Sequence, residues 1–148
     1  MWSDTENGFR DEYFFLSNMY PSLIKIGELK VQCSEILYQV LKVIDRDAKE
    51  ILTDGIINGH IKNGYEAKKI ARLCKLPKSD EYKIMCMRIA LEYKFKNKEL
   101  ADMLIHTGDL ELVEYNTWGD TFWGVCDGKG SNVLGNLLME KRKELMGG

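Results

Sequence analysis

The sequence lacks a long hydrophobic run, an excess of charge of one sign, and a close pair of cysteines or histidines. Its longest apolar stretches are far shorter than the roughly 20 residues that cross a bilayer, so we expect no membrane span. The formal net charge is −2 over 148 residues. A protein whose main work is gripping nucleic-acid phosphates would show a basic excess. These absences are typical of a soluble globular chain.

The cysteines and histidines are too widely spaced to suggest a metal centre. They are Cys33, Cys74, Cys86, Cys126, His60 and His106. No CxxC or HxxxH spacing occurs, so we predict no disulfide framework, no metal and no cofactor. With no recognisable secretory signal, we expect reduced cysteines and a cytoplasmic location.

The length and composition suit one folded unit. A chain of 148 residues can bury a core without disulfides, and 45% apolar with 30% charged residues is ordinary for a globular domain. We therefore predict a single domain over residues 1–148, with no internal repeat. Nothing in the sequence indicates an oligomeric state.

The periodicity predicts a mostly helical α+β domain with a small N-terminal β-hairpin. Alternating apolar residues on either side of Gly27 predict the hairpin. Helical patterns follow from Ser34, from Asp47, over 65–75, from Ser79, from Asn97 and over about 132–145.

Local signals at the helix ends make these predictions specific. Ser34 and Ser79 are placed as N-caps, and Asp47 with Glu50 has capping-box spacing. Gly108 suits a left-handed helix end. The helix from Ser79 is apolar around most of its circumference, so we expect it to be the central buried helix. In the last helix we expect the Glu-Lys-Arg-Lys run at 140–143 to face outward.

The stretch YNTWGDTFWGVCDGKGSN, residues 115–132, combines tryptophans, aspartates and glycines. It matches neither a P-loop nor the dinucleotide fingerprint GxGxxG. Gly128, Gly130 and Ser131 lead into a helix whose exposed amides would bind an anion such as phosphate. The alternative, that these glycines only turn the chain, is equally compatible with the sequence.

Two further features of the sequence carry polar chemistry. Trp118 and Trp123 flank Asp120, which would set a carboxylate beside faces that stack on a flat ring, although simple aromatic burial explains them as well. Glu35 is followed at helical spacing by Tyr38, Gln39 and Lys42, so these four share a face. Whether that face is a site or a solvated surface stays open.

A run of basic residues lies between positions 62 and 83. It consists of Lys62, Lys68, Lys69, Arg72, Lys75, Lys78 and Lys83. Such runs are usually solvated helix surface. The alternative is a surface that binds a protein partner.

Several motifs together resemble the NADAR family, also called YbiA-like. They are FFLSNMYP up to Pro21, SEILYQ with Lys42, LEYKF around Lys94, TGDLELVE, D-x-x-WG from Asp120 to Gly124, and NVLGNLLM. They run in order from about residue 13 to 145. Members of this family are linked to NAD and ADP-ribose metabolism and cleave ribose N-glycosidic bonds, in ADP-ribosylated guanine or in phosphorylated flavin-pathway intermediates.

The resemblance implies a set of site residues. Glu35, Lys42 and Asp120 would be catalytic, and Asn18, Tyr38, Gln39, Lys94, Trp118, Trp123, Gly124, Gly130 and Asn132 would bind substrate. Two carboxylates would divide charge stabilisation and proton transfer, or Lys42 would attack the sugar as a Schiff-base nucleophile. The latter needs a lowered pKa at Lys42, which a neighbouring Glu35 opposes. The partner would be an ADP-ribose-containing or ribose-phosphate ligand, including ADP-ribosylated DNA or RNA.

The chain departs from the family pattern at three positions. Ile36 stands where the family has His, Tyr82 is the aromatic nearest to a family Trp, and Ala71 stands where Gly is common. The alternative function is therefore a catalytically degenerate module that binds ADP-ribose or a related nucleotide without turning it over.

Overall fold

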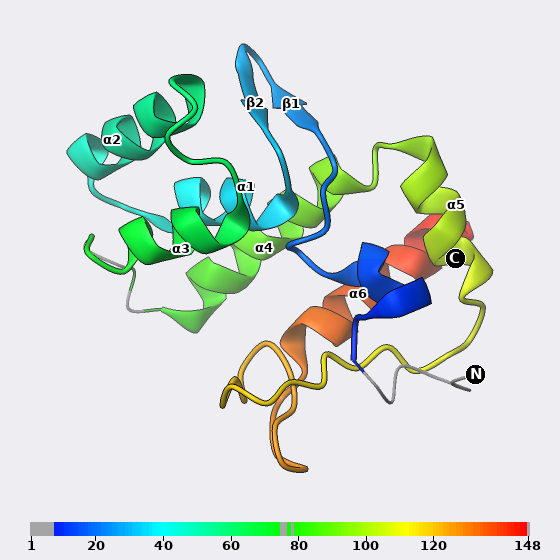
Figure 1. Cartoon of the computed structure of the whole chain (residues 1–148). Helices are drawn as coiled ribbons and strands as arrows, with labels where there is room; N and C mark the ends of the chain where they lie inside the picture. The colour runs from blue at the N-terminus through cyan, green and yellow to red at the C-terminus, as the bar shows by residue number, and fades with distance from the viewer. Residues whose placement is uncertain (1–7, 75–76, 78, 148) are drawn as a thin grey trace. The chain divides into compact units, whose positions relative to one another are not determined.

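The computed structural model of the chain describes residues 8–74, 77 and 79–147, which form two compact units. One unit is Asn18–Lys94, and the other is built from the chain on either side of it. Figure 1 shows the elements of both. The mostly helical α+β class with a hairpin near the N-terminus is confirmed. The single domain over 1–148 stays a prediction, and each unit is described by itself.

The first unit begins with the predicted hairpin. Strands β1 (Ile24–Ile26) and β2 (Leu29–Val31) pair antiparallel, with Ile24 opposite Val31. Gly27 has φ +58°, a conformation that costs glycine little, and so it closes the turn. Ile24 and Val31 are buried, which fixes the register.

Four helices complete this unit. They are α1 (Ser34–Lys42), α2 (Arg46–Ile57), α3 (Gly64–Ala71) and α4 (Asp80–Lys94). Helix α1 packs against α2, α3, α4 and β2 (Figure 1). It buries six consecutive residues from Ser34 to Gln39. The prediction that α4 is the central buried helix is wrong, because α1 holds that place; α4 leaves Met85 51% exposed.

Two predicted helix caps in this unit are also wrong. Cys33 is the N-cap of α1, and Ser34 is the first helical residue. The Ser34 hydroxyl does not cap the helix, because it donates to the Asn18 side chain at 2.8 Å. Asp45 caps α2 by accepting the amide of Asp47 at 2.9 Å, so Asp47 and Glu50 form no capping box. The Ser79 cap of α4 is confirmed: its hydroxyl accepts the Tyr82 amide at 3.3 Å.

The second unit contains a 3₁₀ helix, η1 (Asp11–Leu16), and the helices α5 (Lys98–His106) and α6 (Val133–Leu145). Helices α5 and α6 pack on each other. Asn97 caps α5 as predicted, its side chain accepting the Leu100 amide at 3.1 Å. Gly108, with φ +64°, gives the predicted left-handed end.

The last helix corrects one expectation about its polar run. Leu134, Leu137 and Leu138 are buried, but Arg142 is buried too, at 8% exposure. Its Nη1 donates to the Thr107 hydroxyl at 2.8 Å. A guanidinium tolerates burial when its aliphatic stem packs and its donors are used, so position 142 belongs to the interface of α6 with α5.

The described residues were compared with the expectations about membrane spans, metal sites and cysteines. None of the helices among residues 8–74, 77 and 79–147 is long and apolar enough to cross a bilayer. Over the same residues, His, Cys, Asp and Glu side chains form no group suited to a metal ion. The four cysteines are free, and Cys33 and Cys86 are buried.

Replacing Asn97 by Ala tests the cap of α5. The substitution leaves the Leu100 amide without its acceptor, and losing such a cap costs about 1 kcal/mol of unfolding free energy. Urea denaturation monitored by circular dichroism measures the change. Lys98→Ala, an exposed change one residue on, is the control; equal stabilities of the two variants would contradict the assignment.

Candidate active site

The polar face of α1 is buried. Glu35, Tyr38 and Gln39 are 9%, 3% and 2% exposed. The alternative of a solvated surface is therefore wrong for these three residues. Polar groups are costly to bury unless they are paired, so Glu35 and Gln39 need partners within the fold.

Glu35 and Gln39 form a buried pair one helical turn apart. Gln39 donates from Nε2 to Glu35 Oε2. The other Gln39 atom, Oε1, is buried and has no donor among the described residues. An unsatisfied buried acceptor costs about 1–3 kcal/mol, so this carbonyl is prepared for a donor from water or a ligand.

The backbone around Asn18 fixes the position of Glu35. The Asn18 carbonyl accepts the Glu35 amide at 3.0 Å, and the Asn18 side chain accepts from Ser34 Oγ and donates to Met87. Asn18, predicted to bind substrate, is thus engaged in holding the start of α1. Its role toward a ligand stays a prediction.

Gly64 lets α3 approach Glu35, a contact that the sequence did not reveal. A Cβ at this position would overlap the side chains of Glu35 and Met19. Gly64 is the first residue of α3, where glycine is easily read as ordinary helix-start chemistry. The signal in the sequence that could have indicated this contact was the glycine itself at position 64.

Lys42 lies at the last turn of α1, with its Nζ 5.1 Å from the centroid of the Tyr38 ring. Burial lowers the pKa of Lys42 below the ordinary lysine value. The Glu35 carboxylate raises it, as the sequence indicated, while nearby cations lower it again. Those cations are Lys68, Lys83 and Arg72. Burial and the cations prevail, which is the condition a lysine nucleophile needs.

Lys94 is the most deeply buried charged side chain of this unit. It is 1% exposed, and desolvation lowers its pKa to about 7. The thiol of Cys33 opposes that shift, and burial raises the pKa of the thiol itself. Lys94 was predicted from the family motif alone, and its burial could not be read from a helix that looked apolar all round.

Asp120 lies in the second unit, in a loop that it helps to close. Its Oδ1 accepts the amides of Phe122 and Trp123 at 3.1 and 2.9 Å. The Asn116 side chain makes two hydrogen bonds to the Asp120 backbone. Its Oδ1 accepts from the Asp120 amide at 3.0 Å, and its Nδ2 donates to the Asp120 carbonyl at 2.9 Å. Among the described residues Oδ2 has no hydrogen-bond partner. The supporting Asn116 escaped sequence reasoning.

The two tryptophans beside Asp120 have different surroundings. Trp118 is 60% exposed. Trp123 is half-buried and meets Phe122 edge to face, with ring centroids 4.8 Å apart. Stacking of either on a ligand stays a prediction.

The predicted anion site at the start of α6 is contradicted by the backbone. The amides of residues 131–134 already donate to carbonyls of the Asp120 loop. The four bonds are Ser131 to Thr121, Asn132 to Gly124, Val133 to Phe122 and Leu134 to Trp123, at 2.8–3.3 Å. No donor in this run is left for a phosphate, which favours the turn-forming alternative for Gly128 and Gly130.

The remaining predicted residues of this loop pack tightly. A Cβ at Gly124 would overlap Glu114 and Asn116, and one at Gly130 would overlap the Gly124 carbonyl. Asn132 has φ +50°, accepts the Glu114 amide and donates to the Leu112 carbonyl, each at 3.0 Å. These three residues shape the loop, and their contact with substrate stays a prediction.

Two departures from the family pattern are now placed. Ile36 is fully buried and adds no titratable group beside Glu35. Tyr82 is half-buried, and its hydroxyl donates to the Leu41 carbonyl at 3.2 Å. Tyr82 therefore serves as a support for the end of α1.

The structure gathers the predicted residues in two groups. Asn18, Glu35, Tyr38, Gln39, Lys42 and Lys94 belong to the unit Asn18–Lys94, and Trp118, Asp120, Trp123, Gly124, Gly130 and Asn132 belong to the other. In the first group, hydrogen bonds join Asn18, Glu35 and Gln39. In the second, Asp120 is hydrogen-bonded to Trp123, and Gly124 to Asn132.

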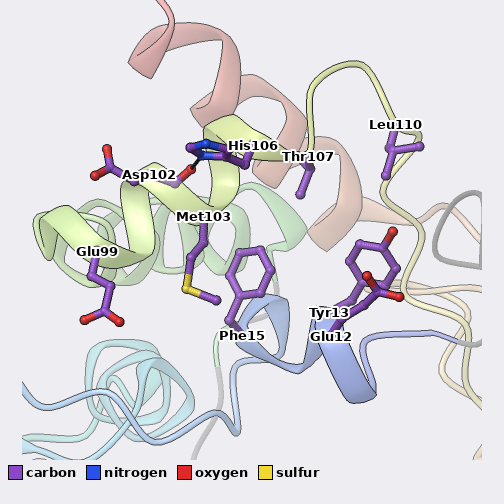
Figure 2. A pocket seen from close by; sticks show the side chains of 9 residues that line it. All are labelled: Glu12, Tyr13, Phe15, Glu99, Asp102, Met103, His106, Thr107 and Leu110. Atoms are coloured by element: carbon purple, nitrogen blue, oxygen red, sulfur yellow. Dashed lines mark hydrogen bonds between the residues drawn. The ribbon is translucent and has the colours of Figure 1, made fainter. Parts of the chain in front are cut away.

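A surface cavity of the second unit is lined by none of these residues. Its volume is about 440 Å³, and Figure 2 shows it between η1 and α5. It is lined by Glu12, Tyr13, Phe15, Glu99, Asp102, Met103, His106, Thr107 and Leu110. Its carboxylates are exposed, and no residue of the predicted site lines it.

Comparison with known proteins places these residues in context. The NADAR domain family model matches residues 2–146. The N-glycosidase YbiA of Escherichia coli is 32% identical over 140 residues, covering 91% of this chain and 83% of that protein. A riboflavin biosynthesis protein of Vibrio vulnificus is 33% identical over 140 residues. The match covers 91% of this chain but only 36% of the length of that protein.

A solved structure gives the same fold. The NMR structure of the Escherichia coli protein YbiA superposes with a TM-score of 0.76 at 33% identity. The match covers 92% of this chain and 80% of that one.

Replacing Lys94 by Met tests its burial through pH dependence. The folded pKa of about 7 lies below the ordinary 10.5, so between these values the unfolded chain binds a proton that the native chain does not. The free energy of unfolding should therefore rise with pH in this window, by up to about 1.4 kcal/mol per unit more in the native sequence than in Lys94→Met.

Chemical denaturation at a series of pH values measures this difference, in which contributions of other groups cancel. Lys96→Met, an exposed change two residues on, should keep the native slope. Parallel pH curves for the native chain and Lys94→Met would show that Lys94 stays charged in the fold.

Proposed function

The chain belongs to the NADAR domain family, and we propose that it is an N-glycosidase that hydrolyses the bond between a ribose carbon and a nitrogen. The observation that carries the proposal is the buried polar face of α1, where Glu35 pairs with Gln39 and Lys42 has a lowered pKa. A merely structural face has no need of a carboxylate and an activated amine seven residues apart.

Glu35 supplies the negative charge. Loss of the nitrogen leaving group builds an oxocarbenium-like centre on the ribose, and a carboxylate nearby stabilises it. The low exposure of Glu35 reduces solvent screening of its charge. The Asn18 carbonyl and Gly64 hold Glu35 in place, so little rearrangement is needed at the moment of reaction.

Lys42 supplies a covalent route. Its neutral amine attacks the anomeric carbon, the carbon–nitrogen bond to the base breaks, and the base leaves with a proton. Opening of the sugar ring gives an imine, which water hydrolyses to the free sugar and the amine. The lowered pKa of Lys42 raises the neutral fraction that starts this sequence.

Gln39 orients the sugar. Its buried Oε1 has no donor among the described residues, and a ribose hydroxyl is a donor of suitable kind. An analogue without that hydroxyl would leave the acceptor unpaired, which is how a polar site rejects it.

The resemblance to the family motivates the proposed substrate class. We propose ADP-ribosylated guanine in nucleic acid, or a ribose-phosphate nucleotide intermediate. The names N-glycosidase and riboflavin biosynthesis protein, carried by the two relatives, support a ribose N-glycoside in either case. Asp120 and Trp123 enter the proposal as predictions from the family motif.

Mass spectrometry of the released sugar tests the proposal. The purified chain is incubated with an oligonucleotide carrying ADP-ribosylated guanine and, separately, with phosphorylated pyrimidine intermediates of flavin synthesis. We expect free ADP-ribose or ribose 5-phosphate. Glu35→Gln and Lys42→Met should each reduce the rate by about 100-fold or more, because each removes a group that acts in the transition state.

Matched controls separate chemistry from charge and folding. Glu28→Gln in the hairpin turn and Lys25→Met on β1 make the same changes at exposed positions and should keep the native rate. Release that persists in Glu35→Gln would rule out the assigned mechanism. Binding without release by the native chain would identify a nucleotide-binding module instead.

A further inference from the structure

The basic run between residues 62 and 83 does not behave as one surface. Lys75 and Lys78 lie outside the described residues. Of the remaining cations, Lys68, Arg72 and Lys83 act electrostatically on Lys42. The fold thus places three of the basic side chains near the C-terminal end of α1, where Lys42 lies.

Helix directions explain the selection. Gly64 at the start of α3 meets Glu35 near the start of α1, and Lys68 and Arg72 act on Lys42 at its end, so α3 runs beside α1 in the same direction. Lys68 and Arg72 follow Gly64 by four and eight residues, which keeps them on the side facing α1. Lys68 is half-buried, whereas Lys69 and Arg72 are exposed.

Helix α4 contributes from the other side. The Tyr82 hydroxyl meets the Leu41 carbonyl, and Lys94 interacts with Cys33, so α4 runs opposite to α1. Its early residue Lys83 therefore comes to the same end of α1 as Lys42. Figure 1 shows α3 and α4 next to α1.

The cluster carries more positive than negative charge. Of the four cations, Lys42, Lys68, Arg72 and Lys83, Lys83 pairs with Asp80 at 3.1 Å, and Glu35 acts on Lys42 from within α1. Lys68 and Arg72 have no ion pair with any other described residue. Bringing like charges together opposes folding, and an anionic ligand would relieve that repulsion.

We propose that Lys68, Arg72 and Lys83 form, next to Lys42, a subsite for a phosphate group of the substrate. An arginine fork and two ammonium groups suit the tetrahedral oxygens of a phosphate. The inference rests on the proposed function for the identity of the substrate, since it places the phosphate beyond Lys42 and the reacting carbon between Lys42 and Glu35. The start of α6, whose amides are occupied, is not used.

Calorimetric binding of ribose 5-phosphate, with ribose as the uncharged comparison, tests the subsite without requiring turnover. The double variant Lys68→Gln/Arg72→Gln should weaken ribose 5-phosphate binding by about tenfold or more, because it removes two charge-assisted contacts. Lys62→Gln/Lys69→Gln loses the same two charges from exposed positions of the same segment and should change the affinity by less than about twofold.

The outcomes are distinguishable. Equal losses in the two double variants would overturn the subsite, because they would show a diffuse charge effect. Selective loss in the first, with no glycosidase activity on any substrate, would support the subsite and count against the proposed function. Turnover with unselective binding would do the reverse. Lys83→Gln alone gives a second reading, with weaker ribose 5-phosphate binding expected and unchanged affinity counting against the subsite.

A nucleic-acid arm identifies the source of the phosphate. If the subsite serves the sugar phosphate, binding of an unmodified single-stranded DNA oligonucleotide should respond similarly to both double variants. A loss confined to Lys68→Gln/Arg72→Gln with DNA, and absent with ribose 5-phosphate, would overturn the assignment to the substrate.

Discussion

The burial of the polar face of α1 is the constraint on which the rest of the site depends. Six consecutive residues from Ser34 to Gln39 are buried, three of them polar. Hydrogen bonds within the fold satisfy them: Asn18 accepts from the Ser34 hydroxyl and the Glu35 amide, and Gln39 donates to Glu35. Only Gln39 Oε1 is left over within the described chain. Two contacts enclose this helix: α3 packs closely against Glu35 at Gly64, and the Tyr82 hydroxyl of α4 is hydrogen-bonded to the Leu41 carbonyl.

The same burial sets the electrostatics of Lys42. A lysine beside a glutamate in water would become a stronger base, yet desolvation and three cations overcome Glu35 here and lower the pKa of Lys42. Burial and the three cations therefore favour a neutral amine at Lys42. The same three cations form the proposed phosphate subsite. Asp120, by contrast, is organised by its own loop, with Asn116 and two backbone amides fixing one of its oxygens.

Sequence patterns predicted those parts of the structure that depend on neighbours in the chain. The hairpin around Gly27, the Asn97 cap and the left-handed Gly108 rest on local geometry, and each is confirmed. Ser34 and Arg142 were misplaced because partners distant in sequence, Asn18 and Thr107, compete for their side chains. The anion site failed for the same reason, since the Asp120 loop returns to occupy the amides of α6. Family motifs supplied Lys94, whose burial no periodicity showed.

The most direct measurement is the pKa of Lys42, followed by NMR of the chain labelled with ¹³C at lysine Cε and assigned with Lys42→Met. The account predicts a pKa below the ordinary 10.5, and a further decrease in Glu35→Gln, because that variant removes the Glu35 charge, which raises the pKa. A pKa at or above 10.5 would show that Glu35 prevails over burial and the cations, and Lys42 would then be a charged side chain with no part as a nucleophile.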